Sequence, residues 1–228
     1  AQEMLQTLEA ISPGYRDVQD MLRRTGAGSF AACLEAGEFD KANDQLLALL
    51  RDYPGVFDEQ EMRQRLVLAQ ARKLFTDRDH DGGRELLRKY LVKHPRDVDV
   101  RLEYLLDYLD EILWQLPTHP KYIYIDPLPN LERLQKVELP SAGIYIFSNA
   151  IAVWQSIIAY AKNYENYDQE ASKALYTSDL RAGNNAYEMY NRYRDQAETS
   201  FTSQLAVFRN FCNQIKIEIE GFVRNQKS

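Results

Sequence analysis

Residues 35–54 read EAGEFDKANDQLLALLRDYP, and their apolar residues are spaced for a helix. A small residue, Ala42, is followed by Leu46 and Leu49, which lie four and seven residues further along the chain. This spacing places all three residues on one helical face. Pro54 cannot continue a helix and marks its end. The stretch therefore predicts an amphipathic helix that packs closely against a neighbour through its small residue.

The same pattern recurs at a constant interval, because Pro13, Pro54 and Pro95 are evenly spaced. We call this interval the repeat period. The matching positions are small (Ala1, Ala42, Gly83), leucine (Leu5, Leu46, Leu87), apolar (Leu8, Leu49, Tyr90) and, after the proline, aspartate (Asp17, Asp58, Asp99). A repeat of this length is typical of stacked helical hairpins. We predict helices near residues 1–11, 16–24, 28–36, 39–52, 58–76, 83–93 and 98–115.

Residues 1–116 resemble the tetratricopeptide repeat family. Gly37, Phe39, Ala42 and Pro54 occupy the places of its Gly-x-aromatic-x-x-Ala turn and of the proline that follows. The second copy departs from the family, with Arg78, His80 and Gly83 at the turn positions, and the repeat period is longer than the family's. A HEAT-type repeat fits the period but not the turn. Ala1 falls at the small position of a second helix, so we expect the natural chain to extend further towards its N-terminus.

The resemblance implies that the first helix of each pair lines a concave groove that holds a protein or peptide partner. On that basis the groove residues are Arg65, Leu68 and Arg72 in the second copy and Asp99, Leu102 and Leu106 in the third. Arg65 and Arg72 lie seven residues apart on one helical face, a spacing that suits a carboxylate or phosphorylated peptide. The alternative for these two side chains is a solvated charged face.

The composition favours a helical globular protein. Of the 228 residues, 45% are hydrophobic and 27% are charged, while only 10 are glycine and 8 are proline. The net charge is −6, and neither half carries a basic stripe, so we do not expect nucleic acid as a partner. Cys33 and Cys212 form no CxxC motif. The compartment and the oligomeric state stay open, with the cytoplasm slightly favoured.

Motifs that carry chemistry point away from an enzyme. Residues 77–82 begin like a calcium loop, but Arg88 stands where its twelfth position requires an acid. His80, His94 and His119 lack metal-ligand spacing, and no phosphate-binding loop or nucleophile motif occurs. We therefore predict no catalytic residues, no metal and no cofactor.

The C-terminal part has a different character. A Pro-rich connecting segment spans residues 117–140 and includes an extended, strand-like stretch at 122–125. Residues 141–228 predict long helices that form a hairpin or bundle and cap the repeats. The charge-free run 140–161 favours a buried helix, with membrane contact as the alternative. Tyr160, Tyr164 and Tyr167 are the candidates for an exposed aromatic surface.

The resulting hypothesis is an all-α protein: a tetratricopeptide-like hairpin array over residues 1–116 followed by a C-terminal helical cap. Its expected role is non-catalytic protein–protein interaction as part of a larger protein. The alternatives are an envelope- or membrane-associated protein that uses residues 140–161, and an enzyme with a site between the two halves.

Overall fold

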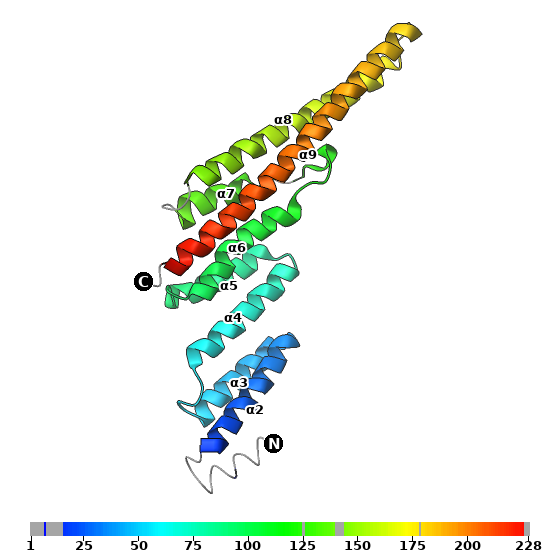
Figure 1. Cartoon of the computed structure of the whole chain (residues 1–228). Coiled ribbons are helices and arrows are strands. Elements are labelled where there is room, and N and C mark those ends of the chain that lie inside the picture. The colour runs from blue at the N-terminus through cyan, green and yellow to red at the C-terminus, as the bar shows by residue number, and fades with distance from the viewer. Residues whose placement is uncertain (1–6, 8–15, 125, 140–143, 178, 226–228) are drawn as a thin grey trace. The chain divides into compact units, whose positions relative to one another are not determined.

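The computed structural model describes residue 7 and residues 16–124, 126–139, 144–177 and 179–225. Within these ranges the regular structure is helical and contains no strand, so the all-α prediction is confirmed (Figure 1). Five helices come first: α2 (Arg16–Glu35), α3 (Phe39–Asp52), α4 (Glu59–Thr76), α5 (His80–Lys93) and α6 (Val98–Gln115). Three more follow: α7 (Leu128–Arg133), α8 (Ile144–Ala174) and α9 (Leu180–Asn225).

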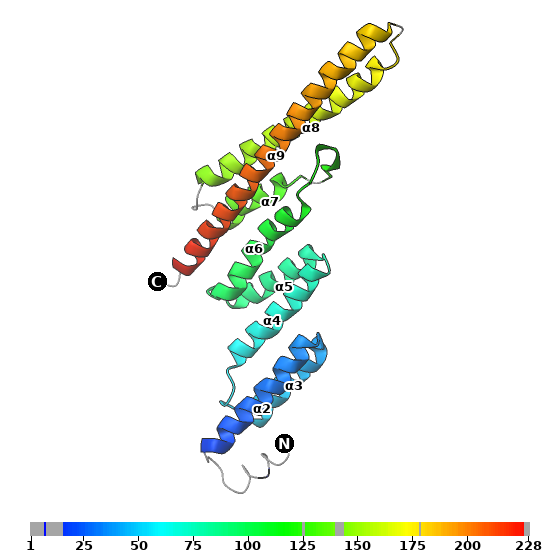
Figure 2. The ribbon, with the colours of Figure 1, turned by 45° about the vertical axis from the view of Figure 1, so that its right-hand side comes forward.

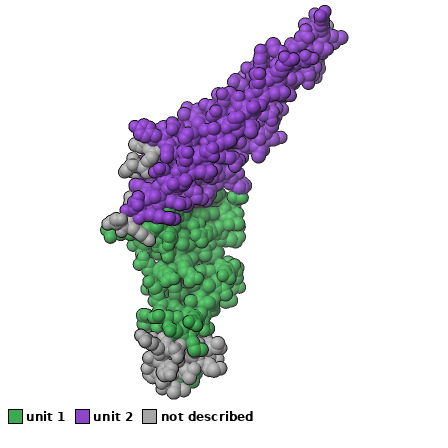
Figure 3. Space-filling view, viewed as in Figure 1, with its two compact units in different colours: residues 1–104 green, residues 105–228 purple. Residues whose placement is uncertain are grey.

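The chain divides into two compact units, residues 1–104 and residues 105–228 (Figure 3). The division falls inside α6, whereas the sequence placed it after residue 116, at the start of the prolines. Leu105, Leu109 and Ile112 are buried in the second half of α6. This half of the helix belongs to the second unit.

The first unit is built from helix pairs. Helix α2 packs against α3 and α4 packs against α5, and Figure 2 shows each pair side by side. The core of the first pair includes Phe30, Ala42 and Leu46, all fully buried. Met62 and Leu66 of α4 join this cluster, so it extends from the first pair into the second.

The turns between the paired helices recur at the repeat period. Gly37 has φ 72° and Arg78 has φ 69°. In both turns the amide of this residue donates to the carbonyl three residues back at 3.1 Å, and the next amide donates five residues back at 2.9 Å. This is the hydrogen-bond pattern of a helix closed by a left-handed residue. The second turn keeps the geometry of the first although it lacks the glycine.

The ends of the second helices repeat as well. Tyr53 ends α3 with φ −134° and ψ 66°, and His94 ends α5 with φ −129° and ψ 63°. The amides of both residues donate at 3.0 Å to the carbonyl four residues back. Pro54 and Pro95 follow these residues, so both prolines come directly after equivalent helix ends. The first unit is therefore an array of packed helix pairs whose turns and helix ends recur.

Two details of the expected repeat are wrong. Helix α2 is continuous across residues 25–27. The absence of a side chain at Gly26 leaves room for Leu49 and Phe57 to pack against this part of the helix. Asp99 does not match Asp58, whose carboxylate accepts from the amide of Glu61 at the start of α4. Asp97 has that role at the start of α6. The loop before α6 is thus two residues shorter. Of the helix expected at 1–11 only Thr7 is described, and it is helical; the other residues of that stretch, and Pro13, lie outside the described residues.

The Pro-rich segment contains short helical turns, and the stretch expected to be extended at 122–125 is so only in part: Tyr122 ends a turn, whereas Ile123 has extended backbone angles, φ −81° and ψ 94°, without forming a strand. A 3₁₀ turn spans Pro120–Tyr122, where the amide of Lys121 donates to Nδ1 of His119 at 3.1 Å. Asp126 accepts from the amide of Leu128 at 3.0 Å, just before α7. A π-helical turn, Leu134–Glu138, follows α7. These side-chain caps favour turns over a strand. Residue 125 lies outside the described residues.

The second unit is dominated by the antiparallel hairpin of α8 and α9 (Figures 1 and 2). Phe147, Trp154 and Ile157 are buried along one face of α8, and the rings of Trp154 and Phe208 lie 5.1 Å apart. The charge-free run thus supplies the seam of this hairpin. Among the described helices, none combines the length and the apolar character that crossing a membrane requires.

Gly183 lies in the first turn of α9. Its amide donates to the carbonyl of Asp179 at 2.8 Å. A side chain here would lie 2.6 Å from the carbonyl oxygen of Ala174. The glycine therefore permits the close approach of the two helices near their connection.

Candidate functional site

An open groove of about 960 Å³ runs between α4 and α5 in the first unit. Helix α4 lines it with Glu59, Gln60, Arg63, Leu66, Val67 and Gln70, and the end of α5 lines it with Leu86, Lys89, Tyr90, Val92, Lys93 and His94. The two helices are antiparallel, so the start of α4 faces the end of α5. We call this groove the α4–α5 groove.

The floor of the α4–α5 groove is apolar and preformed. Leu66 and Val67 are each 8% exposed, so only their edges reach solvent. Tyr90 is held in place because its hydroxyl donates to Asp97 at 3.2 Å and its ring stacks on His94 at 4.5 Å. Burial, followed by the charge of Asp97, raises the pKa of Tyr90 to about 12. Its hydroxyl is therefore protonated at neutral pH and stays a donor.

The rim of the α4–α5 groove is basic. Arg63 is hydrogen-bonded to Glu59 at 2.7 Å, and Lys89 lies 3.6 Å from Glu85. Lys93 forms no ion pair with any described residue. The lining thus holds three cationic side chains and one acidic one. A chain with a net charge of −6 has a locally positive groove.

The first helix pair has a counterpart of this groove. It measures about 60 Å³ and is lined by Gly26, Ser29, Gln45, Ala48, Leu49, Asp52 and Tyr53. Each stands one repeat period before a lining residue of the α4–α5 groove. Gln45 donates to the hydroxyl of Ser29 across the counterpart at 2.9 Å. Asp52 stands where the α4–α5 groove has Lys93. The groove and its counterpart therefore differ in charge as well as in volume.

The groove residues expected from the family resemblance lie on another face of α4 and on α6. Arg72 forms two hydrogen bonds to the carboxylate of Glu103, at 2.9 and 2.7 Å. The guanidinium of Arg65 lies 5.8 Å from the ring centroid of Phe30. Both cations are therefore engaged within the chain.

The other expected groove residues are also placed by the structure. The side-chain amide of Gln64 donates to the carboxylate of Asp97 at 2.8 Å and to that of Asp99 at 3.3 Å. Leu68 and Leu102 are half-buried, and so is Leu106, which belongs to the second unit. The structure thus brings α4 and the start of α6 together through polar pairs, and these residues do not line the α4–α5 groove.

The expected aromatic surface needs a correction. Tyr164 is 6% exposed, because it lies on the same face of α8 as Ile157 and Ala171, which are buried in the hairpin seam. Tyr160 and Tyr167 are half-buried, and the ring of Tyr167 lies 5.4 Å from that of Tyr193. Tyrosines at helical spacing here are mainly packing residues.

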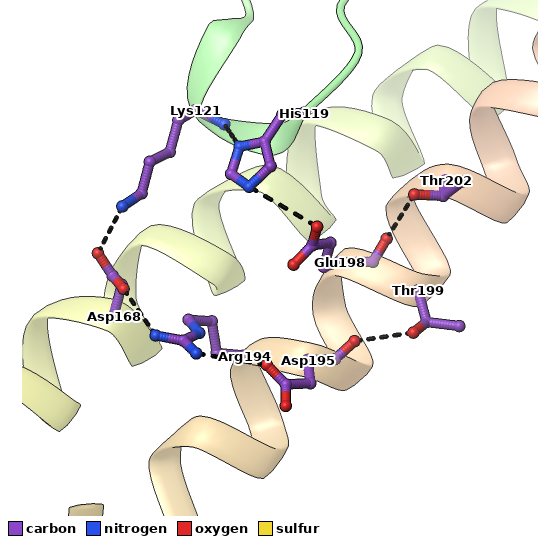
Figure 4. Close-up of polar contacts among 8 residues, drawn as sticks. All are labelled: His119, Lys121, Asp168, Arg194, Asp195, Glu198, Thr199 and Thr202. Carbon is purple, nitrogen blue, oxygen red and sulfur yellow. Dashed lines mark hydrogen bonds and ion pairs between the residues drawn. The ribbon is translucent and has the colours of Figure 1, made fainter.

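A polar cluster, absent from the sequence-based interpretation, crosses the hairpin (Figure 4). Asp168 of α8 accepts from Arg194 of α9 at 3.1 Å and lies 2.9 Å from Nζ of Lys121. Lys121, helped by Arg194, holds the pKa of Asp168 below its usual value. His119 lies 3.7 Å from Glu198. The three segments are far apart in sequence, so no local motif could have revealed this cluster.

The remaining chemistry-bearing residues do not form a site. Asp79, in the calcium-like stretch, caps α5 by accepting from the amide of Gly82. Cys33 and Cys212 are buried and free, and burial raises the pKa of Cys212 to about 12. Among the described residues no group of three or more His, Cys, Asp or Glu side chains is arranged to hold a metal ion.

Comparison with known proteins returned no matching family model, no similar curated protein and no similar solved structure. The fold alone therefore defines the class of protein. The chain is an all-α protein in which a helical repeat precedes a long helical hairpin.

Proposed function

We propose that this chain is a non-catalytic protein-interaction module whose first unit holds a segment of a partner protein in the α4–α5 groove. The observation that carries the proposal is an open groove of about 960 Å³ with an apolar floor. This volume lies at the upper end of the range for pockets that enclose a small molecule. An open trough of this size suits a peptide segment.

Exposed apolar residues support the same role. Val92 is 74% exposed at the edge of the groove. A single exposed valine is ordinary, but here Val92 lines the same groove as Leu66, Val67 and Leu86, and we call these four apolar lining residues the apolar strip. Burying this strip under a partner removes it from water, which is the main favourable contribution to such binding.

The repeat supports a tetratricopeptide-like architecture for this module. The turn at Gly37 recurs in backbone geometry at Arg78, and both prolines follow equivalent helix ends. The repeat period, from Pro54 to Pro95, is longer than that of the family. The partner surface we propose also lies on a different face of α4 from Arg65 and Arg72.

A peptide-display selection against the full chain tests this proposal. Sequences that the wild type enriches should be lost when Val92→Asp places a charge in the apolar strip. The matched control is Val137→Asp, because Val137 is a 64% exposed valine in the second unit. Selected peptides that bind Val92→Asp as well as the wild type, or a selection that enriches nothing, would sink the proposal.

A further inference from the structure

We infer that the segment held in the α4–α5 groove is an acidic amphipathic helix. This inference rests on the proposed function and specifies the chemistry of the partner. The walls and the length of the groove favour a helix. The basic rim, which the counterpart groove lacks, favours acidic flanks.

The helical form follows from backbone hydrogen bonding. A peptide that binds by adding a strand needs a sheet edge to pair its amides and carbonyls, and the described residues of this chain contain no strand. The walls here are two helices whose own backbone groups are already paired. A helix satisfies its backbone internally, so it can press its apolar face onto Leu66, Val67 and Val92 without leaving polar groups unpaired.

The length of the groove suits a short helix. Its α4 wall extends from Glu59 to Gln70, which corresponds to about 17 Å at 1.5 Å per residue. A partner helix of about three turns spans this distance. Packed between α4 and α5, it would complete a three-helix arrangement with ordinary ridge-into-groove contacts.

The acidic character follows from the rim. Lys89 and Lys93 lie one helical turn apart on α5, and Arg63 lies on the α4 wall, while Glu59 is the only acidic lining residue. Acidic residues spaced by four on the partner would meet both lysines. The counterpart groove has Ala48 and Asp52 at the places of Lys89 and Lys93. Since the repeat geometry is otherwise shared, the positive rim belongs to the second pair and is not a general property of the fold.

The test uses the full chain and three fluorescein-labelled synthetic peptides of about 14 residues. The first has leucines at positions i, i+3, i+4 and i+7 and glutamates on both flanks. The second replaces every glutamate with lysine, and the third is a scramble of the first. Fluorescence anisotropy measures Kd at about 0.05 and about 0.5 M salt.

We expect the glutamate peptide to bind at least about tenfold more tightly than the lysine peptide, with affinity that falls at high salt. The variant Lys89→Glu/Lys93→Glu should reverse this preference. The control Lys136→Glu/Lys173→Glu reverses two exposed lysines of the second unit and should leave the preference unchanged.

Equal binding of the glutamate and lysine peptides, both lost in Val92→Asp, would overturn the acidic partner while leaving the interaction module standing. An unchanged preference in Lys89→Glu/Lys93→Glu would overturn it as well. Equal binding of the scramble and the glutamate peptide would overturn the amphipathic helix. Failure of the display selection is a separate outcome, because it removes the proposed function itself.

Discussion

Arg78 stands one repeat period after Gly37 and adopts the same left-handed backbone conformation, with φ 69° against 72°. For a residue with a side chain this conformation costs about 1 kcal/mol. The hydrogen bonds on either side of Arg78 reproduce those around Gly37. The fold therefore imposes the turn on a residue that does not favour it.

Arg78→Gly should be more stable than Arg78→Ala by about 1 kcal/mol, because both remove the side chain but only glycine relieves the strain. Gly37→Ala should lose a similar amount, since open space surrounds the position and the backbone alone resists the change. Urea unfolding followed by labelling of Cys33, the cysteine of the first unit, measures both effects. An Arg78→Ala variant as stable as Arg78→Gly would contradict this account.

Gly83→Ala should destabilise the first unit by about 1–3 kcal/mol, because the added methyl group overlaps the ring of Phe75. The first copy carries Ala42 and Leu34 at these two places. Phe75→Leu/Gly83→Ala installs that combination and should recover most of the loss, which a double-mutant cycle on the same Cys33 readout detects.

The control for this cycle is Gly28→Ala, also inside a helix but with nothing near the added methyl group. It should gain about 0.5–1 kcal/mol from the lower flexibility of the unfolded chain. Strictly additive effects of the Phe75 and Gly83 substitutions would show that the two positions do not share this space.

Asp168→Asn should destabilise the second unit by about 1–2 kcal/mol near neutral pH, because Arg194 and Lys121 lose their charged partner in a partly buried setting. Both tryptophans, Trp114 and Trp154, lie in this unit, so fluorescence reports its unfolding.

The pH dependence of this effect has a defined sign. The pKa of Asp168 is lowered in the folded state, chiefly by its hydrogen bond with Lys121, from an ordinary value of 3.8. Its stabilising contribution is therefore complete above that value and is lost as the pH falls through the lower, folded pKa. The wild type and Asp168→Asn should converge in stability in strong acid. A stability gap that stays constant down to about pH 2 would rule out the charge as its cause.

Arg72→Glu should lower stability by less than about 1 kcal/mol, because Arg72 is 62% exposed and its pair with Glu103 is screened by solvent. Arg72→Glu/Glu103→Arg should restore the pair and the stability. Peptide binding in the α4–α5 groove should be unchanged in both variants. Loss of binding in the charge-swapped variant would instead assign Arg72 to the partner surface.

Much of the fold could be predicted because its determinants are local. The expected helix at 39–52 and the one at 98–115 match α3 and α6 in both bounds. Apolar spacing sets the buried face of such helices, and capping residues or prolines set their ends. The equivalent helix ends before Pro54 and Pro95 likewise depend only on residues a few positions away.

The site could not be predicted in the same way, because it depends on which faces meet. The family resemblance directed attention to Arg65 and Arg72, but Glu103, 31 residues beyond Arg72, engages that guanidinium. The aromatic spacing suggested that Tyr164 was exposed, but it is buried, and the ring of His119 lies 5.1 Å from its own. No local sequence pattern predicts the pairing of Arg72 or the burial of Tyr164.

The sequence by itself determined the helices, their turns and the repeat period, since these follow from propensity and spacing along a single segment. Only the tertiary structure decided that the α4–α5 groove is large and basic while its counterpart in the first pair is small and carries Asp52. The reason is that a groove is the space left between packed helices. Its size and charge depend on side chains that meet only once the chain has folded.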